Sequence, residues 1–348
     1  MSRTRIIIVG AGYAGITAAN RLAARGHQVV LVNGRPDFVE RIRLHELAAG
    51  SARGVTRPLS AMVGRGVDVV IERATALYPD RMEIELASGR VEAADHIILA
   101  TGSDVGGGVR TLESAREARG RIARLGPGSH VQVAGAGPTG VEVAAELAEA
   151  RPDLHVGLND PSGVLPSLPS RHRAGVEATL TRLGVSVTGA VAGEDVAYEI
   201  DCTGFSAAGL AGEAGLQTDG LGRVLVTPTL QVVGHPRVWA VGDCAAVEGQ
   251  PWLRMSCAAA TPMGAHVADG IHRSESGLSP APLDIGFAAL CMSLGRHDGL
   301  VAGVDRRDAP QSFVVRGRVA ASVKEAICRL AARAPRWTRG RFWLRGAA

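Results

Sequence analysis

Short uncharged apolar runs alternate along the chain with stretches whose apolar residues recur at helical spacing. Residues 6–9 form a continuous apolar run of the kind that a buried parallel strand requires. The motif G-x-G-x-x-G follows at 10–15, and after it come a helix-like stretch and a second apolar run at 28–32. This order predicts a strand, a helix and a parallel strand, with the glycines in the first turn.

The same pattern recurs farther along the chain. An apolar run at 130–134 leads into a second G-x-G-x-x-G at 135–140, a helix-like stretch and another apolar run at 154–158. Pro138 stands where a helix can begin without losing a hydrogen bond. In such a turn the first glycine makes the bend, the second lets a pyrophosphate approach and the third lets helix pack on strand. Two copies in the same context predict dinucleotide binding far more strongly than one.

Each repeat ends in an apolar strand that runs into Thr-Gly, at 101–102 and at 203–204. Strand-like pieces at 67–71, 75–78 and 82–86 predict a β-meander inserted in the first repeat, and a shortened one in the second. The prediction is an α/β fold with two Rossmann-like dinucleotide-binding domains, the second inserted in the first, and a small C-terminal α+β segment. The expected boundaries are 1–108 and 228–285 for the first domain, 109–227 for the second and 286–348 for the C-terminal segment.

Composition excludes several classes of protein. The chain is 46% hydrophobic and 21% charged, so it can bury a core, and its 3% aromatic content gives little material for stacking nucleic-acid bases. No run of 18 apolar residues predicts a transmembrane helix, and the glycines within 6–20 argue against a signal peptide. The five cysteines form neither CxxC nor CxxxxC, which predicts no metal site and no redox disulfide, and suits a reducing cytosol.

The order and spacing of the motifs over residues 5–270 resemble the FAD/NAD(P)-dependent pyridine nucleotide oxidoreductases, and among them the type II NADH dehydrogenases. The matching motifs are GAGYAG (10–15), RPLSAMVGRGVDVV (57–70), ILATGS (98–103), GAGPTGVEVAAEL (135–147), DCTGF (201–205) and VWAVGDCA (238–245). The resemblance implies FAD in the first domain and NADH or NADPH in the second. It implies hydride transfer to the flavin and electron transfer to a quinone or a quinone-like small molecule.

The resemblance also assigns the FAD site, with Asn33 where an acid usually binds the ribose. Ala74 would lie near the adenine, and Asp243 would reach the ribityl or pyrophosphate end. Arg43 or His45 could face the flavin, although a solvated helix face is the alternative for both. The expected FAD residues are Gly10, Gly12, Tyr13, Ala14, Gly15, Asn33, Arg43, Ala74, Thr101, Gly102, Gly242 and Asp243.

For NAD(P)H, Asn159 takes the acidic position by register, with Asp160 adjacent. No arginine follows before Arg171 to bind a 2′-phosphate, which favours NADH over NADPH. Glu142 would face the junction of flavin and nicotinamide as the catalytic candidate; the alternative is an acid that stabilises a helix N-terminus. The expected NAD(P)H residues are Gly135, Gly137, Pro138, Thr139, Gly140, Asn159, Asp160 and Gly204.

The acceptor pocket departs from the family. Type II NADH dehydrogenases carry A-Q-x-A-x-Q-x-G beside the quinone, whereas here Ala258 and Pro262 replace the two glutamines. The expected pocket is more apolar and suits a different or bulkier acceptor, such as a biosynthetic metabolite, unless Arg296, His297 or a water supplies the lost donor. Its expected lining residues are Cys257, Ala260, Thr261 and Met263. Two alternatives stay open: a flavin-dependent tailoring enzyme, and an FAD-bound scaffold or signalling protein with slow turnover.

The C-terminal segment is basic and amphipathic. Seven basic residues and one acid lie in the last 25 residues, although the whole chain carries only +4. An apolar stripe precedes three aromatic residues among the arginines. We expect residues 318–348 to dock, either on an anionic membrane or on the first domain or a second copy of the chain, so that the protein is cytoplasmic or peripheral on the inner membrane face. The stripe consists of Val319, Val323, Ile327 and Leu330, and the aromatic residues are Trp337, Phe342 and Trp343.

Overall fold

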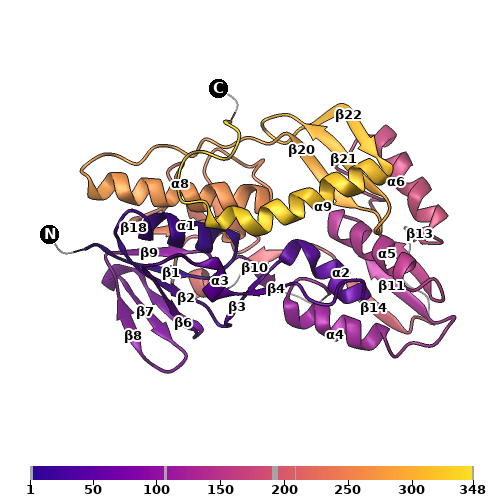
Figure 1. Cartoon of the computed structure of the whole chain (residues 1–348), viewed down its shortest axis with the longest axis horizontal. Coiled ribbons are helices and arrows are strands. Elements are labelled where there is room, and N and C mark those ends of the chain that lie inside the picture. Colours follow the sequence, from indigo (N-terminus) through magenta and orange to yellow (C-terminus); the bar gives the residue numbers. More distant parts are fainter. Residues whose placement is uncertain (1–2, 106–107, 190–194, 208, 347–348) are drawn as a thin grey trace.

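The computed structural model describes residues 3–105, 108–189, 195–207 and 209–346. Over these residues the chain forms two α/β domains and a C-terminal sheet, with a long helix, α9, running across them (Figure 1). The predicted fold class, two parallel-sheet domains with an α+β addition, is confirmed.

An eight-stranded sheet forms the first domain, in the order β19-β16-β17-β18-β9-β1-β2-β5. From β18 to β5 all neighbours are parallel, and the side chains of the central strands β9 and β1 are buried on both faces, which explains their continuous apolar runs. The strands are β1 (Arg5–Val9), β2 (Gln28–Val32), β5 (Val67–Val70), β9 (His96–Leu99), β16 (Val224–Val226), β17 (Gln231–Val232), β18 (His235–Ala240) and β19 (Ala245–Val247).

Helix α1 (Tyr13–Ala23) lies against α8 (Cys257–Glu275). A Cβ at Gly264 would stand 2.2 Å from the carbonyl oxygen of Ala14, so glycine is what lets the two helices approach. The meander differs from its prediction, because the first expected strand joins the main sheet as β5 and a later strand, β8, completes the meander. The smaller elements are β3 (Asp37–Val39), β4 (Thr56–Pro58), β6 (Ala74–Tyr78), β7 (Glu83–Leu86), β8 (Val91–Ala93), α2 (Leu44–Ala49), α3 (Leu59–Met62), α7 (Leu210–Glu213), η1 (Arg41–Arg43), η2 (Pro79–Arg81) and η3 (Gly242–Cys244).

The second domain is a four-stranded parallel sheet in the order β13-β12-β11-β14. The two chain segments that connect it to the first domain pair with each other as an antiparallel ribbon of β10 and β15. Strand β16 already belongs to the first sheet, so the chain returns a few residues before the expected boundary at 228. The elements are β10 (Ser103–Val105), β11 (His130–Ala134), β12 (His155–Asn159), β13 (Ser186–Thr188), β14 (Tyr198–Asp201), β15 (Ser206–Ala207), α4 (Leu112–Ile122), α5 (Pro138–Ala150) and α6 (Ser170–Arg182).

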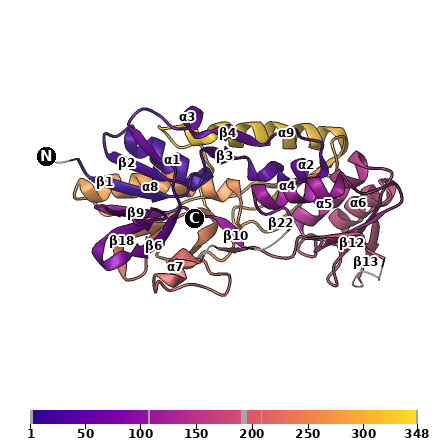
Figure 2. The ribbon, with the colours of Figure 1, turned by 90° about the horizontal axis from the view of Figure 1, so that it is seen from below.

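The C-terminal sheet packs on the second domain. It is antiparallel, with β20 (Ala289–Ser293), β21 (Gly299–Val304) and β22 (Pro310–Arg316), and α9 (Gly317–Arg333) follows it. Met292 and Leu300 from this sheet, and Leu44 and Leu47 from α2, share one buried cluster with the second domain. Figure 2 shows α9 above α2, along the boundary between the domains. The two domains are therefore joined by a shared hydrophobic core as well as by the two chain segments that connect them.

The basic tail is part of the first domain. A short helical turn, η4 (Ala334–Arg336), follows α9, and the carbonyl of Pro335 accepts a hydrogen bond from Asn20 Nδ2 on α1 at 2.8 Å. Arg21 donates to the carbonyl of Gly340 at 2.8 Å, and the indole of Trp343 donates to the carbonyl of Asp284 at 3.0 Å. These contacts fasten residues beyond Arg333 to the flank of α1.

Candidate functional site

One cavity of about 660 Å³ lies between the domains. The first glycine turn and η3 line one side of it, and Pro138 and Thr139 from the second glycine turn line another. Cys257 at the start of α8 and Lys324 on α9 close its remaining end. Residues that are remote in the sequence therefore line the same cavity.

The first glycine turn leaves an open cradle. Gly10 has φ +107°, and a Cβ there would lie 2.3 Å from the carbonyl oxygen of Ala100. A Cβ on Gly15 would lie 1.9 Å from the carbonyl oxygen of Gly10. A Cβ on Gly12, by contrast, meets no protein atom within 4 Å, and Gly12 lines the cavity at the N-terminus of α1. The first and third glycines thus build the turn, while the second leaves space that a pyrophosphate group fits.

The second turn repeats this geometry. Gly135 has φ +93°, a Cβ on Gly140 would lie 1.8 Å from the carbonyl oxygen of Gly135, and a Cβ on Gly137 would meet nothing within 4 Å. The two copies therefore leave the same open space at their second glycine.

At the end of the second strand of the second repeat, Asp160 and not Asn159 takes the position expected for the ribose-binding acid. Asn33 Oδ1 accepts the N–H of Ala11 at 3.0 Å, and its counterpart is Asp160, whose Oδ2 accepts the N–H of Ala136 at 2.9 Å. Asn159 instead lies within β12, paired with Ala134. The backbone N–H groups of Ala136 and Ser162 hold the pKa of Asp160 below its ordinary value. A carboxylate therefore stands at the second strand end, where an acid binds ribose hydroxyls.

Asp243 is the buried acid of the first domain. It lies in η3 and accepts a hydrogen bond from Ser103 Oγ at 3.0 Å. Burial raises its pKa, while Arg41 and the Ser103 hydroxyl oppose that shift. Several other residues expected at FAD line the cavity with it: Gly10, Gly12, Tyr13, Ala14, Asn33, Thr101, Gly102 and Gly242. A buried acceptor beside the open cradle fits a cofactor that presents hydroxyl groups.

Other expected residues do not line the cavity. Arg43 turns away, because its guanidinium pairs with Glu46 at 2.9 Å and Glu325 at 2.7 Å, and Arg41 lines the cavity instead. Ala74 lies in β6, outside the lining. In the expected acceptor pocket Cys257 and Ala260 line the cavity, whereas Thr261 and Met263 are buried within α8. Gly15, Gly135, Gly137, Gly140, Asn159, Asp160 and Gly204 also lie outside the lining.

Neither side chain proposed as a substitute donor reaches the cavity. Arg296 pairs with Glu46 at 3.1 Å and Glu146 at 2.7 Å, and His297 is largely exposed beside Glu149. The donor that does line the cavity is Lys324.

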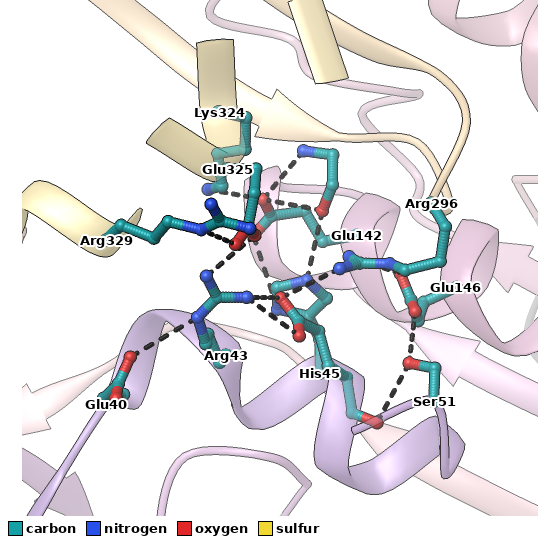
Figure 3. Close-up of polar contacts among 12 residues, drawn as sticks. Glu40, Arg43, His45, Ser51, Glu142, Glu146, Arg296, Lys324, Glu325 and Arg329 are labelled. Carbon is teal, nitrogen blue, oxygen red and sulfur yellow. Dashed lines mark hydrogen bonds and ion pairs between the residues drawn. The ribbon is translucent and has the colours of Figure 1, made fainter. Parts of the chain in front are cut away.

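Glu142 is the centre of a buried polar cluster (Figure 3). Its Oε1 lies 2.8 Å from Lys324 Nζ and accepts the N–H of Ser293 at 3.0 Å, and its Oε2 lies 4.0 Å from His45 Nδ1. Burial alone would raise the pKa of Glu142, but Lys324, His45 and the Ser293 N–H hold it below its ordinary value. Burial likewise opposes the charge on Lys324, yet Glu142 keeps the pKa of the amine above its ordinary value. Glu142 and Lys324 therefore form an ion pair at the cavity wall.

Sequence reasoning missed Lys324 as a site residue. It is the only lysine of the chain, and it lies on the inner face of α9 between Ala320 and Cys328, both buried. A single lysine at an inward helical position is the signal that could have indicated it. Cys291 on β20 and Cys328 on α9 also line the cavity and were not expected there.

The outer face of α9 carries the apolar stripe. Val319 is 64% exposed and Leu330 51%, while Val323 and Ile327 are partly exposed on the same face. The expectation that the stripe packs on the first domain is wrong, because these side chains are exposed, and α9 packs with its other face on the C-terminal sheet. None of the described helices has the length and apolar character needed to cross a membrane.

Comparison with known proteins is consistent with this geometry. The family model for pyridine nucleotide-disulphide oxidoreductases matches residues 4–269. Ferroptosis suppressor protein 1 of Xenopus tropicalis is 27% identical over 85% of this chain and 87% of its own. The type II NADH:quinone oxidoreductase Ndh of Mycobacterium tuberculosis is 27% identical over 80% of this chain and 74% of its own. NDH2 of Plasmodium falciparum, solved with NADH, superposes with a TM-score of 0.81 at 13% identity over 96% of each chain. The predicted family is thereby confirmed: the chain belongs to the pyridine nucleotide-disulphide oxidoreductases and is an oxidoreductase.

Proposed function

We propose that this protein is an FAD-dependent oxidoreductase that oxidises NADH and reduces a quinone or quinone-like small molecule. The observation that carries the proposal is the cavity of about 660 Å³, whose wall includes residues of both glycine turns and the Glu142–Lys324 pair. Family membership and a relative named as a type II NADH:quinone oxidoreductase support it.

The two nucleotides would be held by different residues, FAD by cavity-lining groups of the first domain and NADH by groups of the second domain. The open cradle at Gly12 and the buried Asp243 would hold the pyrophosphate and ribityl parts of FAD. Asp160 and the second turn would hold the NADH ribose and pyrophosphate. FAD, when bound, takes hydride from NADH and passes two electrons to the acceptor.

The acceptor end would be formed by Glu142, Lys324 and Cys257. The Lys324 ammonium can donate a hydrogen bond to a carbonyl oxygen of the acceptor, and its ion pair with Glu142 fixes its position. The overall reaction, NADH + H⁺ + quinone giving NAD⁺ + quinol, consumes one proton per turnover. A polar cluster that holds and moves a proton at the cavity wall suits that requirement.

Anaerobic mixing of the purified yellow protein with NADH, and separately with NADPH, tests the nucleotide half of the proposal. Rapid flavin bleaching by NADH is expected, and a strong preference for NADPH would contradict it. Steady-state turnover with a short-chain quinone then tests the acceptor. Turnover with soluble dyes but none with the quinone would favour the second candidate, a tailoring enzyme acting on another small molecule. Ala258 lines the cavity at a position where type II NADH dehydrogenases carry glutamine, and this difference favours the second candidate.

The outer face of α9 is proposed to rest peripherally on an anionic membrane surface. Its exposed stripe ends near Trp337, which is 39% exposed, and near several arginines. Apolar side chains beside cations match a lipid interface. Ile327 belongs both to the stripe and to the cavity lining, so an apolar acceptor could reach the cavity from that surface.

A further inference from the structure

The polar cluster at the cavity wall contains a buried histidine, His45, beside the Glu142–Lys324 pair. His45 is the second residue of α2, its ring is 4% exposed, and it lines the cavity. Its Nε2 lies 3.1 Å from Ser293 Oγ, and Ser293 Oγ lies 3.3 Å from Glu142 Oε1. Its Nδ1 faces Glu142 Oε2 at 4.0 Å. Both ring nitrogens of His45 are therefore directed at the Glu142 carboxylate. Nε2 reaches it through the Ser293 hydroxyl, and Nδ1 faces it directly.

This arrangement leaves room for one additional proton. If the Ser293 hydroxyl donates to Glu142, His45 must donate from Nε2 to Ser293, and its Nδ1 then presents a lone pair to a carboxylate oxygen. A proton added at Nδ1 would turn that unfavourable approach into a charge-assisted contact. The two carboxylate oxygens of Glu142 differ accordingly, because Oε1 is bound by Lys324 and Ser293 whereas Oε2 faces the imidazole of His45.

We propose that His45 is a positioning residue that stores the proton consumed in each turnover and delivers it to Glu142. The inference rests on the proposed function, in which an acceptor oxygen takes up a proton at the cavity wall. The proton moves from His45 Nδ1 to Glu142 Oε2, a proton from the Glu142–Lys324 pair goes to the acceptor oxygen, and a solvent proton returns to the imidazole. One proton enters and one leaves, so the cluster ends in its starting state.

The charges around the ring support a proton that moves easily. Burial lowers the pKa of His45, and Lys324 on α9 acts in the same direction. Glu142 and Glu146 on α5 and Glu46 on α2 oppose that shift. Arg296 pairs with both Glu46 and Glu146, and Lys324 pairs with Glu142, so each of the three acids already has a cationic partner. Ser51, which is exposed, contacts Glu146 and places this side of the cluster close to solvent.

The test compares acceptors that need protons with one that needs only electrons. His45→Gln can keep a hydrogen bond to Ser293 but cannot carry the proton. We expect it to lower turnover with a short-chain quinone and with dichlorophenolindophenol by at least about tenfold. Ferricyanide turnover and the rate of flavin reduction by NADH should change by less than about twofold, because neither needs an added proton. His172→Gln is the matched control, since His172 is fully buried on α6 outside the cavity.

The pH profile separates proton delivery from a merely structural effect. Dye turnover of the unaltered protein should fall as pH rises through the apparent pKa of the His45–Glu142 unit, and His45→Gln should show a flat profile at the lower rate. Equal losses with dye and ferricyanide, or an unchanged pH profile, would overturn the proposal. If His45→Gln fails to retain flavin, Ser293→Ala takes its place, and an unchanged pH limb in that variant overturns the proposal equally. Dye turnover without quinone turnover in the unaltered protein would refute the proposed acceptor alone, because the dye still reports on His45.

Discussion

Lys324 Nζ lies 2.8 Å from Glu142 Oε1 and thereby joins the C-terminal helix to the first turns of the second domain's α5. The neighbouring residue, Glu325, pairs with Arg43 of the first domain at 2.7 Å. Two consecutive side chains of opposite charge thus connect α9 to both domains at the wall of the cavity. The position of α9 and the chemistry of the acceptor end are consequently linked.

Lys324→Met should lower both stability and quinone turnover. Loss of one partner leaves the Glu142 carboxylate buried without its ammonium, which costs about 3–5 kcal/mol in comparable buried pairs. Urea unfolding measures this change. The double variant Lys324→Met/Glu142→Leu should recover most of the stability but not the turnover. A double variant as unstable as the single one would show that the pair is not the cause.

The same pair predicts a pH dependence. The pKa of Glu142 is lowered in the folded protein, so its contribution to stability is present above the ordinary pKa of a glutamate. That contribution is lost as the pH falls through the lowered folded pKa. Lys324→Met should therefore show a smaller loss of stability on acidification than the unaltered protein, measured as unfolding free energy between about pH 6 and pH 3. Parallel curves for the two proteins would contradict the assignment.

Gly12→Val should abolish flavin binding while leaving the fold intact. A Cβ at Gly12 meets no protein atom within 4 Å, so the side chain would enter the space left for the pyrophosphate. The ratio of flavin to protein absorbance measures the loss. Gly137→Val is the matched control in the second domain and should keep the flavin while raising the KM for NADH. Gly10→Val should instead prevent folding, because its Cβ would lie 2.3 Å from the carbonyl oxygen of Ala100.

Asp160→Ala should raise the KM for NADH by about tenfold without loss of flavin, since the carboxylate stands at the ribose position of the second domain. Asn159→Ala is the control, because Asn159 lies within the pairing of β12 and β11. Asp160→Asn should narrow the preference for NADH over NADPH by removing a negative charge near the 2′ position. Stopped-flow reduction with each nucleotide measures both effects. An equal response of Asn159→Ala would show that Asn159, as expected from the sequence, takes the ribose position.

Val319→Asp/Leu330→Asp should abolish flotation with anionic vesicles if the outer face of α9 meets the membrane. Leu278→Asp, at a 54% exposed site away from that face, is the control and should still float. Truncation at Ala334 is a poor test, because it would remove the carbonyl of Pro335 that Asn20 binds. Failure of the unaltered protein to float would end the membrane proposal.

Ala258→Gln should lower the KM for a short-chain quinone about fivefold or more, since an amide donor would be restored at a cavity-lining position. Pro262→Gln should have little effect, because Pro262 is buried in α8 and does not line the cavity. If the double variant Ala258→Gln/Pro262→Gln and the unaltered protein have the same quinone turnover, Lys324 already supplies the hydrogen-bond donor to the quinone.

The local parts of the site were predictable from the sequence, and the tertiary parts were not. Each glycine turn needs only a local spacing, so Gly10 and Gly135 were identified with their roles. The ribose acid was displaced by one residue, because the strand expected at 154–158 lies one residue later, as β12 at His155–Asn159. Arg41 and Arg43 point in different directions from one short turn, a difference that spacing alone does not reveal.

The meeting of Lys324 with Glu142 depends on how α9 crosses the domain boundary. The amphipathic pattern of α9 indicated its apolar stripe but not which face would turn inward. In the structure the apolar stripe is the outer face, and the face that carries the lysine is buried.

The hydrogen bonds from Asn20 to the carbonyls of Met62 and Pro335 have a consequence for how the protein is made. The sheet of the second domain comes from one continuous stretch of the chain, so its strands can pair before the later residues are made. The first domain has to wait, because its sheet needs β16–β19 and its first helix needs the tail. The sheet and first helix of this domain are therefore completed later than their own early strands are made, and until then α1 lacks the contacts that residues beyond Arg333 give it.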